Sequence, residues 1–272
     1  MKRFALPCLA TLLASAAFAP IANAFGVGIQ PSTVEMTVKE GDRQRQVVTI
    51  GNVHKEKTIT LQLGLADWSL DETGQLVLDA PGETERSAAD WVRFSPASVT
   101  LKPETSADVT VEITTPYQVG ETGDHRFALL ATTLLPDIDK RGGQSGVWAK
   151  YQLASLFYLT FQPSESLPVV TSAEVSSDDG MLTMKLANEG DAHARIQGLA
   201  TVKDASGEVV NELQVNTVVL DRATRTLSMP IATPDMKSGS YRVEFDLDNS
   251  FTPQNNFRRM DVDADAVEYV AP

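Results

Sequence analysis

Apolar and polar residues alternate in short runs along most of this chain, and turn-forming residues separate the runs. Clear examples are residues 58–65, 108–113, 181–186 and 241–247. Alternation with a period of two places one face of a strand in a core and the other in water. The runs recur about every ten residues, as in β-sandwiches, and almost no segment has the period of a helix. The pattern predicts an all-β protein.

The longest apolar run outside the N-terminal region spans residues 147–161 and follows a glycine-rich segment, residues 140–146. It is more than twice the usual strand length of about five or six residues. At a sheet edge, such a strand would expose unpaired N–H and C=O groups, which proteins normally protect. We therefore predict that residues 153–159 lie at the rim of a sheet and pair with another polypeptide.

Strand periodicity divides this run into two faces. The more apolar face is the row that we expect a partner to contact, and it consists of Val147, Ala149, Tyr151, Leu153, Ser155, Phe157 and Leu159. Gln152, Ala154, Leu156 and Tyr158 form the opposite face. Lys150 interrupts the run, either as a solvated residue that opposes self-association or as an anchor for the partner.

Turn residues follow a similar order in the two halves of the chain. Asn52, Asp67 and Gly74 in the first half correspond to Asn188, Asp204 and Gly207 in the second. Residues 123–127 and 239–243 both begin with Gly and have Arg at the fourth position. Two sandwiches in tandem are therefore expected, joined near residues 162–168, with domains at residues 25–163 and 164–272. Pro31 is expected to break the first strand so that its two parts join different sheets.

The N-terminal residues indicate export. A basic start is followed by an apolar stretch that ends at Ala22-Asn23-Ala24, a signal-peptidase pattern, so residues 1–24 are predicted to be a cleaved signal peptide. The single cysteine, Cys8, lies inside that peptide. Loss of Lys2 and Arg3 changes the net charge from −13 to −15, which argues against nucleic acid and anionic membranes as partners. No later stretch has the ~18 apolar residues of a membrane helix, so a periplasmic location without membrane insertion is expected.

No enzyme or cofactor motif stands out. The three histidines, His54, His125 and His193, have no second ligand at zinc-site spacing. Residues 261–265 begin like a calcium loop, but Ala266 and Pro272 occupy the places of the required Gly and Glu. Nucleophile elbows, phosphate-binding loops and dinucleotide fingerprints are missing from the sequence. We expect no catalytic activity, no metal and no cofactor.

Several segments together resemble the periplasmic pilus chaperones of the chaperone-usher family, in an atypical form. They are residues 29–36 (Ile-Gln-Pro-Ser-Thr-Val-Glu-Met), Gly41, Asn52, residues 66–68 (Ala-Asp-Trp), residues 94–103 (Phe-Ser-Pro-Ala-Ser-Val-Thr-Leu-Lys-Pro), residues 123–127 (Gly-Asp-His-Arg-Phe), Pro136 and residues 161–163 (Phe-Gln-Pro). The resemblance covers about residues 27–163, and only the order and spacing of the segments carry it.

The resemblance implies two immunoglobulin-like β-sandwich domains, with the last strand of the first domain lent to an incomplete pilus or fimbrial subunit. It also implies delivery to an outer-membrane usher. The family's two basic cleft residues fall on about Met36 and Tyr158 here, so Lys150 and Arg126 are the candidate client anchors. The alternative is a structural or adhesive envelope protein whose long strand completes its own sheet. Self-association through that strand is a further expectation.

Overall fold

The computed structural model describes residues 26–134, 150–175, 180–231, 239–249, 258–263 and 267–269. The predicted signal peptide with Cys8, Pro136, and Val147 and Ala149 of the predicted row lie outside these residues. The described residues contain no helix that is long and apolar enough to cross a membrane. They form β-strands and one short 3-10 turn, so the predicted all-β class is confirmed.

In the part of the chain that the structure describes, the first sandwich has ten strands. These are β1 (Val27–Gln30), β2 (Thr33–Val38), β3 (Arg43–Asn52), β4 (Ile59–Leu70), β5 (Leu76–Asp79), β6 (Val92–Ser95), β7 (Ser98–Leu101), β8 (Ser106–Thr114), β9 (Gly123–Thr133) and β10 (Gln152–Phe161), with the 3-10 turn η1 (Ala89–Trp91) before β6. One sheet has the order β1-β3-β8-β6, and the other has the order β2-β10-β9-β4-β5, with β7 also on β4. This connectivity is that of an immunoglobulin-like domain.

Eight strands of the described residues form the second sandwich. These are β11 (Pro168–Val175), β12 (Met181–Asn188), β13 (Ala194–Lys203), β14 (Val209–Val219), β15 (Ala223–Pro230), β16 (Gly239–Asn249), β17 (Arg258–Asp263) and β18 (Val267–Tyr269). The orders are β11-β12-β15 and β14-β13-β16-β17, with β18 also on β16. The prediction of two immunoglobulin-like sandwiches in tandem is therefore confirmed.

Pro31 divides the first strand as predicted. The Gln30–Pro31 peptide bond is cis, β1 before it pairs with β3, and β2 after it pairs with β10 in the opposite sheet. The break therefore carries the chain across one side of the sandwich, where both sheets end.

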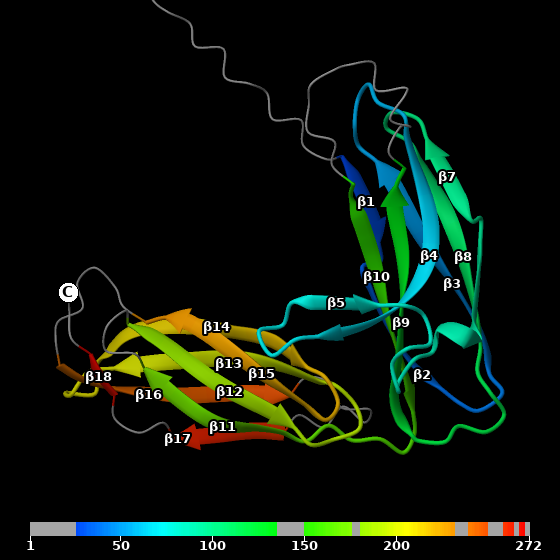
Figure 1. Cartoon of the computed structure of the whole chain (residues 1–272). Helices are drawn as coiled ribbons and strands as arrows, with labels where there is room; N and C mark the ends of the chain where they lie inside the picture. Colours follow the sequence, from blue (N-terminus) through cyan, green and yellow to red (C-terminus); the bar gives the residue numbers. More distant parts are fainter. Residues whose placement is uncertain are drawn as a thin grey trace, which may run out of the picture.

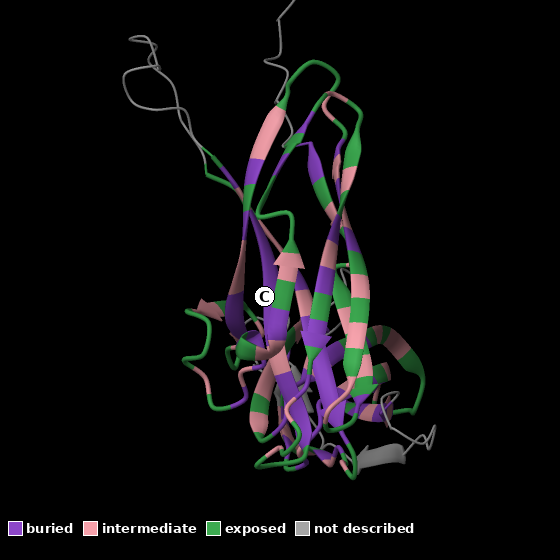
Figure 2. Cartoon of the chain, turned by 90° about the vertical axis from the view of Figure 1, so that its right-hand side faces the viewer, coloured by how far each residue is buried: buried purple, intermediate pink, exposed green. Residues whose placement is uncertain are grey.

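Each sandwich has its own apolar core, built from alternate residues of its strands. Figure 2 shows the alternation as bands of buried and exposed residues along the strands of the first domain. Phe127 and Phe157 stack in that core with ring centroids 4.4 Å apart, and both are fully buried. The core of the second domain is centred on Leu182, Met184 and Leu186 of β12 and facing residues of β13 and β16.

The two domains repeat the same local structures. The Asn52 side chain donates to the carbonyls of Lys57, Leu101 and Lys102, and the Asn188 side chain donates to those of Ala192, Val219 and Leu220. The predicted match between these two asparagines is therefore confirmed.

The predicted match between Asp67 and Asp204 was wrong by four residues. Asp204 corresponds to Asp71 rather than to Asp67, because both Asp71 and Asp204 accept bonds from the residues two and four positions later. Each of these turns is closed by a glycine with positive φ, Gly74 at 75° and Gly207 at 87°.

Figure 1 shows the two sandwiches arranged as an L, with the link between β10 and β11 at the corner. On the inside of the L, the β4–β5 hairpin of the first domain reaches β15 of the second. The Thr226 amide donates a 2.6 Å hydrogen bond to the Glu72 carbonyl there. A third apolar cluster, which includes Trp68, Tyr158 and Leu220, joins the domains at the corner.

Candidate functional site: the open flank of strand β10

Strand β10 is paired along its full length on one flank and along only part of it on the other. β9 runs antiparallel to residues 152–161, whereas β2 runs parallel to residues 156–161 only. Within the described part of the chain, no strand pairs with residues 152–155 on the β2 side. We call this four-residue stretch the open flank.

The prediction that residues 153–159 lie at the rim was therefore correct for residues 153–155 and wrong for residues 156–159. The physical reason is β2, which Pro31 sends into this sheet and which covers the second half of β10. The Leu156 amide donates to the Ser32 carbonyl at 2.9 Å, and this bond ends the open flank.

The hydrogen bonds on either side of the open flank show to which side each residue directs its main-chain N–H and C=O groups. Thr133 N–H donates to the Tyr151 carbonyl at 2.9 Å, so Tyr151 faces β9, whereas Leu156 faces β2. Successive residues of a strand direct their N–H and C=O groups to alternate sides. The main-chain N–H and C=O groups of Gln152 and Ala154 therefore point to the open flank. Those of Leu153 and Ser155 point to β9.

The predicted contact row is divided by the same boundary. Phe157 and Leu159 are fully buried in the core of their own domain, between β2 and β9, so their assignment to a partner-binding row was wrong. Ser155 is also buried, and its hydroxyl donates to the Pro31 carbonyl at 2.7 Å. Of the described members of the predicted row, only Tyr151, which is 42% exposed, and the half-buried Leu153 can face a partner.

The opposite sheet also ends beside the open flank. β1 pairs only with β3 among the described strands, and its Val27 and Ile29 pack against the core from that edge. Both sheets of the first sandwich therefore end at the same rim. A strand added to β10 there would extend one sheet and cover apolar residues of both.

The candidate anchor Arg126 lies at the junction between the two domains rather than beside the open flank. Its guanidinium forms an ion pair with Asp221 of the second domain, and both side chains are largely buried. It also lies 5.8 Å from the centre of the Trp68 ring. Arg86 is 3.8 Å from the same carboxylate and 2.7 Å from Glu121. Arg126 is thus committed to the domain junction, while Lys150 is exposed beside the open flank.

A second polar cluster at the corner involves residues that the sequence analysis did not select. The fully buried His193, in the loop before β13, places Nδ1 2.6 Å from Asp124 Oδ2 and Nε2 3.6 Å from Glu35 Oε1. The Glu35 carboxylate also pairs with Arg195 of β13. The centroids of the Tyr158 ring and the His193 imidazole are 4.1 Å apart. We call Glu35, Asp124, His193 and Arg195 the corner cluster.

Each charged group of the corner cluster favours the charged form of the oppositely charged groups that it contacts. Burial alone would lower the pKa of His193, but its two carboxylate neighbours outweigh burial and raise the pKa above the ordinary 6.5. Burial likewise acts to raise the pKa values of Asp124 and Glu35. Bonds from His193 and Thr160 to Asp124, and from His193 and Arg195 to Glu35, outweigh it and lower both. Burial also raises the pKa of Tyr158, so its phenol stays neutral.

The corner cluster occupies the place where the chaperone resemblance put two basic residues. Tyr158 faces Glu35 across β10 and β2, and Met36 packs against the core. The basic side chains of the cluster, His193 and Arg195, belong to the second domain. A weak signal for the cluster existed in the sequence, because the polar residues Asp124, His125 and Arg126 stand together at the start of a strand whose middle, residues 127–131, is apolar.

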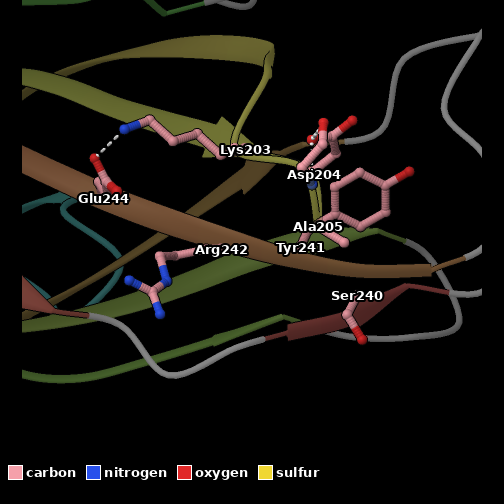
Figure 3. Close-up of a pocket in the computed structure, with 9 residues that line it drawn as sticks. Lys203, Asp204, Ala205, Ser240, Tyr241, Arg242 and Glu244 are labelled. Atoms are coloured by element: carbon pink, nitrogen blue, oxygen red, sulfur yellow. Dashed lines mark hydrogen bonds and ion pairs between the residues drawn. The ribbon is translucent and has the colours of Figure 1, made fainter.

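A hollow at the far end of the second domain has a different character. Lys203, Asp204, Tyr241, Arg242 and Glu244 are among its lining residues, and its volume is about 440 Å³ (Figure 3). Lys203 Nζ lies 2.5 Å from Glu244 Oε2, and the Asp204 carboxylate accepts bonds from its own turn. Lys203 and Glu244 thus neutralise each other, and Asp204 is bonded within its own turn. No cluster of three or more potential metal ligands occurs within the described ranges.

No protein-family model and no curated protein matches the sequence. Solved structures do resemble most of the chain. One contains the CsuC–CsuE chaperone–tip adhesion subunit complex of archaic chaperone-usher Csu pili from Acinetobacter baumannii (14% identity, 86% of this chain and 97% of the other, TM-score 0.47). Others are the E. coli chaperone DraB (9%, 88% and 97%, 0.45) and the class 5 fimbriae chaperone CfaA (11%, 86% and 99%, 0.44). Similarity of this degree carries no inference about function.

Proposed function

We propose that this protein is a periplasmic, non-catalytic chaperone that binds an incomplete β subunit by adding a strand of that subunit to β10. The observation that supports this proposal is the open flank. Its main-chain groups at Gln152 and Ala154 face away from β9, and no described strand pairs with them. Strand addition at such an edge combines main-chain hydrogen bonds with side-chain contacts on alternate residues.

The surroundings of the open flank fit a partner that lacks part of its own core. Tyr151 and Leu153 point to the same side of β10, and Val27 and Ile29 of β1 line the other sheet at this rim. Burying one large apolar side chain contributes roughly 1.5–3 kcal/mol. By the resemblance in sequence, the partner is a pilus or fimbrial subunit, and an outer-membrane usher receives the complex.

A proline scan of β10 tests the proposal. Ala154→Pro removes an N–H that faces the open flank and leaves the bonds to β9 intact, because edge positions with a free N–H tolerate proline. Leu153→Pro removes an N–H that bonds to β9 and should destabilise the domain. We expect Ala154→Pro to fold but to lose the subunits that wild-type protein retains when purified from periplasmic extract of its native host.

Thermal unfolding of both variants checks that Ala154→Pro is folded. Hydrogen exchange gives a second measurement, because the amides of Gln152 and Ala154 should become protected when a subunit binds. If wild-type protein is recovered alone from cells that make candidate subunits, the proposal is wrong and a structural or adhesive role is favoured.

A further inference from the structure

We propose that His193 is a pH-sensitive latch between the two domains: when protonated it joins two carboxylates of the first domain to the second, and when neutral it keeps only the contact with Asp124, so that the angle of the L varies more widely. This inference does not depend on the proposed chaperone function. It rests on the geometry of the corner cluster, in which one imidazole of the second domain lies between two carboxylates on different strands of the first.

The first contact of the latch is with Asp124 of β9. Asp124 Oδ2 accepts a 2.7 Å hydrogen bond from the His193 amide and lies 2.6 Å from Nδ1. Asp124 is itself fixed, since Thr160 donates to its other oxygen at 2.7 Å and its amide donates to the Asp191 carbonyl at 2.8 Å. This contact does not require the charged form, because a neutral imidazole can still donate one N–H from Nδ1.

The second contact, with Glu35 of β2, does require the charged form. Nε2 lies 3.6 Å from Glu35 Oε1, which is an ion-pair distance. With Nδ1 donating to Asp124, only the imidazolium also carries a proton on Nε2. Loss of that proton leaves a buried acceptor nitrogen facing a carboxylate, which is repulsive. Deprotonation therefore weakens the link between β2 and the second domain.

The charged and titratable groups around the imidazole come from four strands and its own loop. Glu35 (β2) and Asp124 (β9) favour protonation, whereas Arg195 (β13) opposes it but also neutralises Glu35. Tyr158 (β10) presents its ring and stays neutral. Arg126 (β9) is paired with Asp221.

Asp191 lies in the same loop as His193. Its carboxylate accepts from the Glu165 amide at 2.8 Å and from the Thr122 hydroxyl at 3.2 Å, which directs it to the linker. The net effect of all these groups keeps the imidazole protonated at pH 6.5, its ordinary midpoint. The latch therefore opens as the pH rises above that value.

The test measures the distance between domains as a function of pH. The mature chain has no cysteine once Cys8 is removed, so two cysteines introduced at the exposed Thr100 and Glu212 can carry spin labels. We expect a narrow distance distribution at pH 6 and a broader one as the pH rises through the midpoint of His193. His193→Gln should give the same distribution at every pH between 6 and 9, because glutamine does not titrate.

The matched control is His54→Gln, since His54 lies in a turn of the first domain and should leave the transition unchanged. The imidazole titration of labelled wild-type protein, followed by nuclear magnetic resonance, needs no substitution at His193. Its midpoint should lie above 6.5 and coincide with the change in distance. The proposal is overturned if the wild-type distance does not change with pH, or if its transition persists in His193→Gln or departs from the midpoint of the imidazole.

Discussion

The Leu156 amide donates a 2.9 Å hydrogen bond to the Ser32 carbonyl, and this bond divides β10 into a part that belongs to its own domain and a part that is open on one side. After Leu156, every residue of β10 has a neighbour on both flanks. Before it, only β9 is present among the described strands. The two parts should therefore respond differently to substitution.

Phe157→Ala should destabilise the first domain without a specific effect on partner binding. Phe157 is fully buried and stacks on Phe127, so truncation leaves a cavity that costs about 3–5 kcal/mol. Tyr151→Ala should lower the unfolding free energy by much less than Phe157→Ala does, because the side chain is 42% exposed. Urea unfolding of the two variants measures the difference. A large loss of stability in Tyr151→Ala would contradict this division of the strand.

Arg126→Met should destabilise the protein by about 3–5 kcal/mol, because it leaves the Asp221 carboxylate buried without its partner. In Arg126→Met/Asp221→Asn no uncompensated carboxylate remains, so part of the loss should be recovered. Chemical unfolding of the single and double variants gives the coupling energy. Additive effects would show that Arg86, 3.8 Å from Asp221, already neutralises the carboxylate.

Gly74→Ala should destabilise the contact between the β4–β5 hairpin and β15. A Cβ at this position would lie 1.1 Å from the Arg225 guanidinium, so that side chain would have to leave. Gly207 is the matched control, since it closes an equivalent turn with similar positive φ and has no atom within 4 Å of its added Cβ.

Both glycine substitutions carry the backbone cost of positive φ, which is about 1 kcal/mol. Only Gly74→Ala should in addition disturb the domain contact, seen as faster amide exchange at Thr226, whose N–H bonds to Glu72. Equal exchange at Thr226 in both variants would argue against this role for Arg225.

The two buried histidines should give the protein a stability maximum near pH 6.5. The pKa of His125 is lowered, and burial is the largest cause of this shift. The neutral imidazole therefore stabilises the folded protein above pH 6.5, and this contribution is lost as the pH falls from 6.5 through the lowered pKa. The pKa of His193 is raised, so its contribution is complete below 6.5 and is lost as the pH rises through the raised value.

Urea unfolding at a series of pH values measures both slopes. His125→Gln should flatten the profile just below pH 6.5, and His193→Gln should flatten it above. A wild-type profile that is level on both sides would refute the pair of assignments.

Local signals in the sequence were sufficient to predict the strands and their arrangement in two sandwiches. Alternation, Pro31 and the paired asparagines Asn52 and Asn188 are properties of short segments, and the structure agrees with what they predict. The sequence did not show which strands distant in the chain pair with each other. Because β2 joins β10 in parallel, its position depends on the whole sandwich, and nothing near Phe157 or Leu159 indicates that a neighbour covers them.

The corner cluster was invisible for a related reason. Glu35, Asp124 and His193 are far apart in sequence and meet only when the two domains come together. Arg126 was selected as an anchor because of its charge and its place in a motif, but the sequence does not show that Asp221 lies opposite it.

Within the described residues, the main-chain groups of the open flank hold another chain only weakly by themselves. Gln152 and Ala154 offer two N–H and two C=O groups, and each hydrogen bond contributes only about 0.5–1.5 kcal/mol net in water. Four such bonds do not clearly exceed the 4–15 kcal/mol estimated for lost rotational and translational freedom on association. A strand attached only through these main-chain groups would therefore depend on side-chain contacts for most of its affinity.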